Sequence, residues 1–184
     1  MASLSVILLA GGYGTRLYPL TKDRPKALLP LGQGVLLDHL MRGLRQVPGL
    51  AKVVLVTNRR FAPQFDAWRR ARADRPAPPQ NFGGARAGAV ELVDDGTTRP
   101  EDRLGALRDL QLAWDRAKGQ EVLVIGTDNI FTWSLPSFVA CAQAKRPAAT
   151  IATWKVPDKV VVADRTWALD TLAPLAEVPP ADGA

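Results

Sequence analysis

Three glycines and a nearby arginine form the segment of this sequence best suited to chemistry. Residues 9–17 read Leu-Ala-Gly-Gly-Tyr-Gly-Thr-Arg-Leu. Glycine has no Cβ, so a glycine-rich backbone can turn sharply and bring its N–H groups against phosphate oxygens. We therefore expect a phosphate loop here, and its predicted binding residues are Leu9, Ala10, Gly11, Gly12, Gly14 and Thr15.

Two cationic side chains complete this predicted phosphate loop. Arg16 offers a planar fork of donors to a phosphate, and Lys26 adds a compact positive charge ten residues later. The spacing differs from a Walker loop, which needs Gly-Lys-Ser/Thr, and from the dinucleotide fingerprint. The alternative is a plain turn between a strand and a helix, and Arg16 with Lys26 makes that alternative the weaker one.

A carboxylate follows another apolar run. Asp128 comes shortly after Val122–Ile125. Carboxylate oxygens suit Mg²⁺, which can bridge phosphate oxygens and offset their charge during attack at phosphorus. The alternative is an Asx turn, in which the Asp128 side chain bonds its own backbone. We favour the metal role because strand-end carboxylates in a parallel sheet face the ligand crevice.

The elements that would position these residues alternate between apolar strands and amphipathic helices. The predicted strands are Ser5–Leu9, Val53–Thr57, Val90–Val93, Val122–Ile125 and Thr150–Trp154. The predicted helices are Leu36–Val47, Pro63–Ala73, Asp102–Ala117 and Leu135–Ala144. The strands are too continuously apolar to leave one face in water, so we expect a covered, mainly parallel sheet. Repeated strand–helix–strand units predict a three-layer α/β/α sandwich with ligands at the carboxyl ends of the strands.

Composition limits the classes of function. The 184 residues, 47% hydrophobic and 23% charged, fit one globular domain. No run approaches the roughly 18 apolar residues of a membrane span, and Met1–Ala10 does not resemble a signal peptide, so we expect a cytoplasmic protein without a membrane partner. The net charge of +6 raises nucleic-acid binding as an alternative. A solvated helix face explains the arginines better, so we predict no nucleic-acid partner.

The phosphate-loop segment and the residues after it resemble a known signature. Leu9–Thr21, followed by Arg24-Pro-Lys-Ala-Leu-Leu-Pro-Leu-Gly32, is similar to the signature of sugar-1-phosphate nucleotidylyltransferases, the family of glucose-1-phosphate thymidylyltransferase. The resemblance implies a Rossmann-like fold of the nucleotide-diphospho-sugar transferase type, with the loop around a nucleoside triphosphate. It also implies that Arg16 steadies the phosphates leaving as pyrophosphate and that Lys26 contacts the reacting phosphate.

Two later segments extend the resemblance. Gly126-Thr-Asp-Asn129 is similar to the family's Gly-Asp-Asn metal-binding turn with one inserted threonine, which implies Mg²⁺ at Asp128. The residues from Asp94 to Leu107 resemble the stretch that seats the base and ribose, which implies contacts from Thr98 and Gly105. The equally supported alternative is an ordinary helix start capped by Thr98 or Asp102.

The implied reaction is in-line substitution. A sugar-1-phosphate oxygen would attack the α-phosphorus of a nucleoside triphosphate and yield a nucleotide-sugar and pyrophosphate. Positioning and charge neutralisation would carry the rate, without a covalent nucleophile on the protein. The expected partners are therefore a nucleoside triphosphate and a sugar-1-phosphate.

The C-terminal part departs from the family pattern. We interpret residues 1–157 as the nucleotide-binding core, and residues 158–184 as a partial sugar-binding segment with a tail. Glu177-Val178-Pro179 stands about where the family has Glu-Lys-Pro, which implies a sugar contact from Glu177. Because valine replaces the lysine that grips the sugar phosphate, the alternative is a truncated, nucleotide-binding homologue with impaired catalysis. A sheet edge left uncovered in a short chain would favour a homo-oligomer.

Overall fold

A computed structural model describes residues 3–73, 90–117 and 121–153 of the chain. It divides the chain into two compact units, Met1–Phe131 and Thr132–Ala184. The domain boundary predicted at residue 157, and Glu177 with it, lie outside the described residues. Within the described residues, no helix has both the length and the apolar character needed to cross a bilayer.

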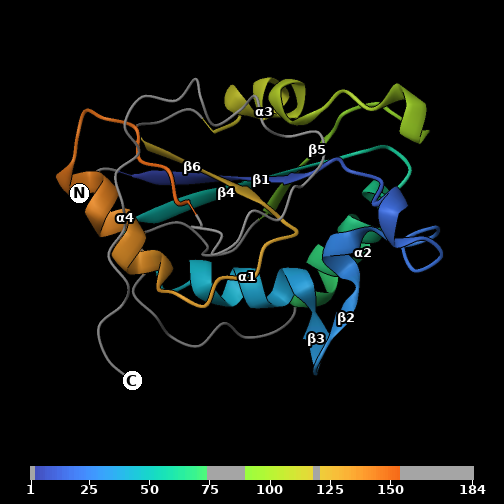
Figure 1. Ribbon diagram of the computed structural model, residues 1–184, viewed down its shortest axis with the longest axis horizontal. Helices are drawn as coiled ribbons and strands as arrows, with labels where there is room; N and C mark the ends of the chain where they lie inside the picture. Colours follow the sequence, from blue (N-terminus) through green and yellow to red (C-terminus); the bar gives the residue numbers. More distant parts are fainter. Residues whose placement is uncertain (1–2, 74–89, 118–120, 154–184) are drawn as a thin grey trace, which may run out of the picture. The chain divides into compact units, whose positions relative to one another are not determined.

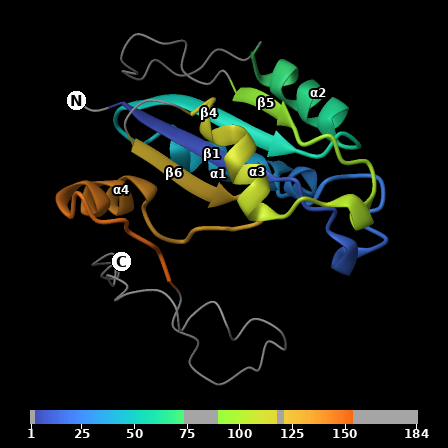
Figure 2. The same ribbon diagram turned by 90° about the horizontal axis from the view of Figure 1, so that it is seen from above.

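A four-stranded parallel sheet forms the centre of the first unit. Its strands are β1 (Leu4–Ala10), β4 (Leu50–Thr57), β5 (Val90–Asp94) and β6 (Glu121–Gly126). They lie in the order β5-β4-β1-β6, and every pairing is parallel. Figure 2 shows the four strand arrows pointing the same way. Ala10 pairs with Thr57, and Thr57 pairs with Asp94, so the carboxyl ends of these strands meet at one edge of the sheet.

Helices cover both faces of this sheet. Figure 1 shows α3 (Ala106–Trp114) on one face, with α1 (Leu36–Leu44) and α2 (Ala62–Ala73) on the other. The fully buried side chains of Ile7, Val54 and Val56 pack with Ala113 and Ala117 beneath α3. The predicted three-layer α/β/α sandwich with a parallel sheet is therefore confirmed.

Short elements connect the first strand to the first helix. They are two 3-10 helices, η1 (Thr15–Leu17) and η2 (Lys26–Leu28), and an antiparallel pair of two-residue strands, β2 (Pro30–Leu31) and β3 (Gly34–Val35). The apolar periodicity does not predict these elements because two or three residues are too few to show a period.

The second unit contains α4 (Leu135–Ala144), whose predicted bounds are confirmed. The Ser134 side chain accepts a hydrogen bond from the Ser137 N–H at 3.3 Å and so caps the first turn. Pro136 lies within that turn, where its missing N–H removes no helical bond. Local sequence signals therefore suffice to define this helix.

Three predicted elements differ clearly from the structure, and the first is the helix predicted over Leu36–Val47, which ends at Leu44. The helix predicted over Asp102–Ala117 begins only at Ala106, because Gly105 before it takes a positive φ of 86° that a helix cannot continue through. Neither Thr98 nor Asp102 caps it, so that alternative is wrong for α3, and Pro100–Asp102 instead forms the 3-10 helix η3. Residues 150–153, predicted as part of a strand, are not in a strand, since no described strand pairs with them.

One partly buried carboxylate joins α1 to α2. Asp38, in the first turn of α1, accepts hydrogen bonds from the Val35 N–H and from Trp68 Nε1, both at 3.0 Å, and forms an ion pair with Arg72. Burial alone would raise the pKa of the Asp38 carboxyl, but these donors outweigh burial and hold that pKa below its usual range. A depressed pKa in the folded state means that the carboxylate stabilises the fold above the unfolded pKa and loses this effect as pH falls through the folded pKa.

We expect Asp38→Ala to lower the free energy of unfolding by about 2–3 kcal/mol at pH 7, because it leaves the buried Trp68 N–H and the Arg72 guanidinium without their acceptor. Urea unfolding at pH 7 and pH 3 measures this, and the difference between variant and wild type should shrink at pH 3. The matched control is Asp66→Ala, which removes surface pairs with Arg69 and Arg70 and should cost less than about 1 kcal/mol. Equal losses in the two variants would contradict the role of Asp38.

Candidate functional site

Segments that follow four parallel strands are tied together at one edge of the sheet. The N–H and the Oγ1 of Thr127, after β6, donate to the carbonyl of Leu9 in β1 at 3.1 and 3.0 Å. The Asp95 N–H, after β5, donates to the Thr57 carbonyl of β4 at 2.9 Å. The chain beyond each strand is thus fixed relative to its neighbour, as expected for a ligand site at the carboxyl ends of a parallel sheet.

The predicted phosphate loop takes a shape that depends on two of its glycines. Gly14 has φ 63° and ψ 27°, the left-handed conformation that side chains disfavour, and Thr21 Oγ1 donates to its carbonyl at 2.7 Å. Gly11 is buried, and a Cβ built on it would overlap Asp109 Oδ2 and lie 3.1 Å from Asp95 Oδ2. Glycine is therefore required at both positions, for conformation at one and for space at the other.

The backbone N–H groups of this loop are available to a ligand. Among the hydrogen bonds between described residues, none has the N–H of Gly12, Tyr13 or Gly14 as its donor. Consecutive N–H groups without protein acceptors form an anion-binding concavity. The loop also lacks an acidic side chain between Gly11 and Arg16, so nothing within it competes with an anion.

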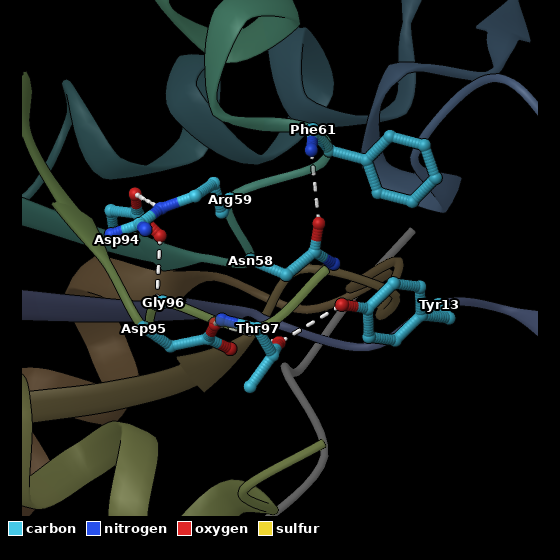
Figure 3. A network of polar contacts seen from close by, with 8 residues as sticks. All are labelled: Tyr13, Asn58, Arg59, Phe61, Asp94, Asp95, Gly96 and Thr97. Carbon is cyan, nitrogen blue, oxygen red and sulfur yellow. Dashed lines mark hydrogen bonds and ion pairs between the residues drawn. The ribbon is translucent and has the colours of Figure 1, made fainter. Parts of the chain in front are cut away.

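A chain of hydrogen bonds connects the phosphate loop to the segment after β5 (Figure 3). Tyr13 Oη lies 2.9 Å from Thr97 Oγ1, and Thr97 Oγ1 lies 2.7 Å from Asp95 Oδ1. Because the Thr97 hydroxyl donates to the Asp95 carboxylate, the Tyr13 hydroxyl donates to Thr97. Tyr13 is only 4% exposed, and burial above all raises the pKa of its phenol, so it stays a donor. The loop is thus linked to the segment after β5.

Asn58 supplies a second anchor. It follows β4 and is fully buried, its Nδ2 donates to the Gly11 carbonyl at 3.0 Å, and its Oδ1 accepts from the Phe61 N–H at 2.9 Å. Sequence reasoning missed Asn58, Asp95 and Thr97. The available signal was the same as for Asp128, namely a polar residue directly after an apolar strand.

Hydrogen bonds hold the turn after β5. The Asp94 carboxylate accepts from the Gly96 N–H at 2.8 Å and from Arg59 Nε at 2.9 Å, as Figure 3 shows. The Arg59 N–H donates to the Thr97 carbonyl at 2.9 Å, which joins this turn to the end of β4. Thr98, predicted to contact the nucleotide, follows the turn and is exposed.

Lys26 and Asp128 come together although 102 positions separate them. Lys26 Nζ lies 3.3 Å from Asp128 Oδ2, and the two side chains are 38% and 56% exposed. The hydrogen bonds of the Asp128 carboxylate come from side chains, those of Lys26 and Asn129, and not from its own backbone as an Asx turn requires. Thr127 directly follows β6 and is buried, so its insertion leaves Asp128 at the strand end.

The Asp128 carboxylate can supply one ligand to a magnesium ion. The described residues contain no group of three or more acidic, histidine or cysteine side chains that could hold a metal. A half-exposed carboxylate is an oxygen donor suited to Mg²⁺, which commonly takes one or two protein carboxylates and completes its shell with phosphate oxygens and water. Asp128 therefore fits Mg²⁺ delivered with a polyphosphate.

Arg16 and Gly105 are the remaining predicted residues, and both are exposed. Arg16 lies in η1 with an exposed side chain, for which the described residues supply no hydrogen bond or ion pair. Gly105 is exposed and precedes α3. The structure thus brings Lys26 to Asp128 and connects Gly11 to Asn58, and the functional roles of all the predicted site residues stay predictions.

The comparisons with known proteins agree with this architecture. The model of the nucleotidyl transferase family matches residues 5–161. A bifunctional IPC transferase and DIPP synthase of Aquifex aeolicus is 39% identical over 127 residues, 69% of this chain and 25% of that protein. An N-acetylmuramate alpha-1-phosphate uridylyltransferase of Caulobacter vibrioides is 38% identical over 74 residues, 40% of this chain and 30% of that protein.

The fold also matches solved structures. A putative glucose-1-phosphate thymidylyltransferase from Bacillus anthracis superposes with a TM-score of 0.63 at 23% identity, over 82% of this chain and 54% of that chain. The chain spans between a quarter and just over half of the length of these relatives. Since the family model covers most of the sequence, the chain belongs to the nucleotidyl transferase family.

Proposed function

We propose that this protein transfers a nucleoside monophosphate from a nucleoside triphosphate to a sugar-1-phosphate, releasing pyrophosphate. The observation that carries the proposal is the loop from Gly12 to Gly14, whose N–H groups have no acceptor among the described residues, at the sheet edge where Lys26 meets Asp128. Anion donors, a cation and a carboxylate are what phosphoryl-type transfer needs for positioning and charge neutralisation.

The proposed roles follow from the chemistry of each group. The loop N–H groups and Arg16 would hold the phosphates that leave, and Lys26 would contact the phosphate under attack. Asp128 would hold Mg²⁺, whose positive charge would offset the negative charge of the reacting phosphates. The 3.3 Å pair of Lys26 and Asp128 supports this proposal, because it keeps the cation and the carboxylate close enough to act on one ligand.

Thr98 and Gly105 are our proposed contacts for the base and ribose. Thr98 follows a turn held by the Asp94 carboxylate, and Gly105 directly precedes α3. Glu177 is the proposed sugar contact on the basis of sequence alone. Residues 1–157 and 158–184 remain the proposed core and sugar-binding segment.

The names of two relatives support a sugar-1-phosphate as the acceptor. One is an N-acetylmuramate alpha-1-phosphate uridylyltransferase and the other a glucose-1-phosphate thymidylyltransferase. Both names pair a pyrimidine nucleotide with a sugar phosphate. The competing proposal is a nucleotide-binding homologue that does not turn over, and it rests on Val178, where the family pattern has lysine.

The experiment that separates these proposals measures pyrophosphate release and nucleotide binding on the same protein. We expect release with Mg²⁺, one of dTTP, UTP, CTP, GTP or ATP, and one member of a panel of hexose-1-phosphates, and no release without the sugar phosphate. Binding of a triphosphate with no release across the panel would favour the non-catalytic homologue. Absence of triphosphate binding would contradict both.

A further inference from the structure

A buried carboxyl group of α3 is not used by the proposed reaction. Asp109, in the first turn of α3, is only 6% exposed, and its Oδ1 has no hydrogen-bond partner among the described residues. A buried carboxylate without donors is costly, so such groups are usually paired or neutral. The position of Asp109 therefore needs a physical explanation.

The Asp109 carboxyl faces the phosphate loop together with a second acid. A Cβ built on Gly11 would overlap Asp109 Oδ2 and would lie 3.1 Å from Asp95 Oδ2, so both carboxyl groups flank the same face of Gly11. The other oxygen of Asp95 is occupied by the N–H and hydroxyl of Thr97, both at 2.7 Å. Among the described residues, the Asp95 carboxylate therefore has two donors, whereas the Asp109 carboxyl has none.

Burial, and then the charge of Asp95, raise the pKa of Asp109 to about 6. The side chains of β1 and β4 that pack against α3, among them Ile7, Val54 and Val56, are apolar and carry no compensating charge. On α3 itself the neighbouring Arg108 is exposed, and the partial positive charge of the first helical turn acts in the opposite direction to burial.

We propose that Asp109 is a positioning residue for the phosphate loop, that it acts as a neutral carboxylic acid, and that it takes up a proton when polyphosphate binds at Gly11–Gly14. The proposal rests on the proposed function, because it assumes that the loop binds a triphosphate. With one proton, the Asp95–Asp109 pair carries a single negative charge beside Gly11. Without this proton, the two carboxylates would repel each other, and they would also repel the phosphates that bind to the loop.

Linkage fixes the sign of the effect. A bound polyanion favours the neutral acid, so the pKa of Asp109 rises further in the complex and binding consumes protons. Between the pKa of the free protein and that of the complex, the dissociation constant should rise by up to about tenfold per pH unit. Asp109→Asn keeps the shape and removes the titration, so this part of the pH dependence should vanish.

The test is calorimetric titration of the wild type with the tightest-binding triphosphate of the panel, at pH 7 in two buffers that differ in ionisation enthalpy. We expect uptake of up to about one proton per nucleotide in the wild type, beyond the uptake that Asp109→Asn shows with the same ligand. The ligand's own titration is common to both proteins and cancels. Asp115→Asn, the same charge change at the other end of α3, is the matched control and should behave as the wild type.

The outcomes distinguish the two proposals. Equal proton uptake in wild type and Asp109→Asn, with binding intact, would overturn the role of Asp109 and leave the proposed function standing. Failure of the wild type to bind any triphosphate would overturn the proposed function itself.

A second measurement, of stability, keeps the proposal testable if Asp109→Asn binds the triphosphate poorly. A raised pKa in the folded state costs stability above pH 6, so Asp109→Asn should be more stable than wild type at pH 8 but not at pH 4.

Discussion

Lys26→Ala is expected to lower kcat for pyrophosphate release by about 10²–10³-fold, the usual cost of removing one group that stabilises charge in a transition state. Lys26 Nζ lies 3.3 Å from Asp128 Oδ2, so the variant also leaves that carboxylate without its cation beside a polyanion. Repulsion between Asp128 and the phosphates then adds to the loss. Steady-state kinetics with the active pair of substrates from the panel measures it.

The split between kcat and KM identifies the role of the lysine. A contact to the reacting phosphate that strengthens in the transition state lowers kcat, whereas one that only holds the substrate raises KM. Lys52→Ala is the matched control. Lys52 lies near the start of β4 and pairs with Glu91 of β5, at the opposite edge of the sheet from Lys26. This variant should leave both kcat and KM unchanged. A Lys26→Ala variant with wild-type kcat would remove Lys26 from the proposed mechanism.

Four of the five predicted strands and the sharp turn at Gly14 could be predicted because their signals are local. An apolar run such as Val53–Thr57 reports burial within a few residues, and a left-handed residue such as Gly14 needs glycine whatever surrounds it. The start of α3 was misplaced because the apolar period continues through Gly105, whose conformation the period cannot report. The local sequence pattern therefore predicts the type of an element better than the residues at which the element begins and ends.

The groups that support the loop could not be predicted in the same way. Tyr13 meets Thr97 across 84 positions of sequence, and Asn58 reaches Gly11 across 47. These contacts depend on the parallel order of β1, β4 and β5, which brings the strand ends together only after folding. The carboxyl ends of the strands indicate where a ligand site lies, but they do not indicate which of the polar residues after each strand contacts the phosphate loop.

Gly11→Ala is expected to destabilise the fold by about 1–3 kcal/mol, the usual cost of overpacking a filled interior. The added methyl group would overlap Asp109 Oδ2 and press on Asp95, and both acids lie in segments held by their own hydrogen bonds. Relief requires either the acids or Gly11 to shift, and a shift of Gly11 would strain its hydrogen bond from Asn58, distort the loop and weaken triphosphate binding. Urea unfolding and nucleotide titration measure the two effects.

Gly12→Ala provides the control within the same loop. A Cβ at Gly12 meets nothing within 4 Å, and its φ is not in the left-handed region, so the variant should fold with unchanged or slightly increased stability. The double variant Gly11→Ala/Asp109→Ala should recover part of the lost stability, because removing the Asp109 carboxyl opens the space that the new methyl group needs. Additive losses in that double variant would mean that the methyl group does not meet Asp109, and the packing of Asp109 against Gly11 would then no longer explain why glycine is required there.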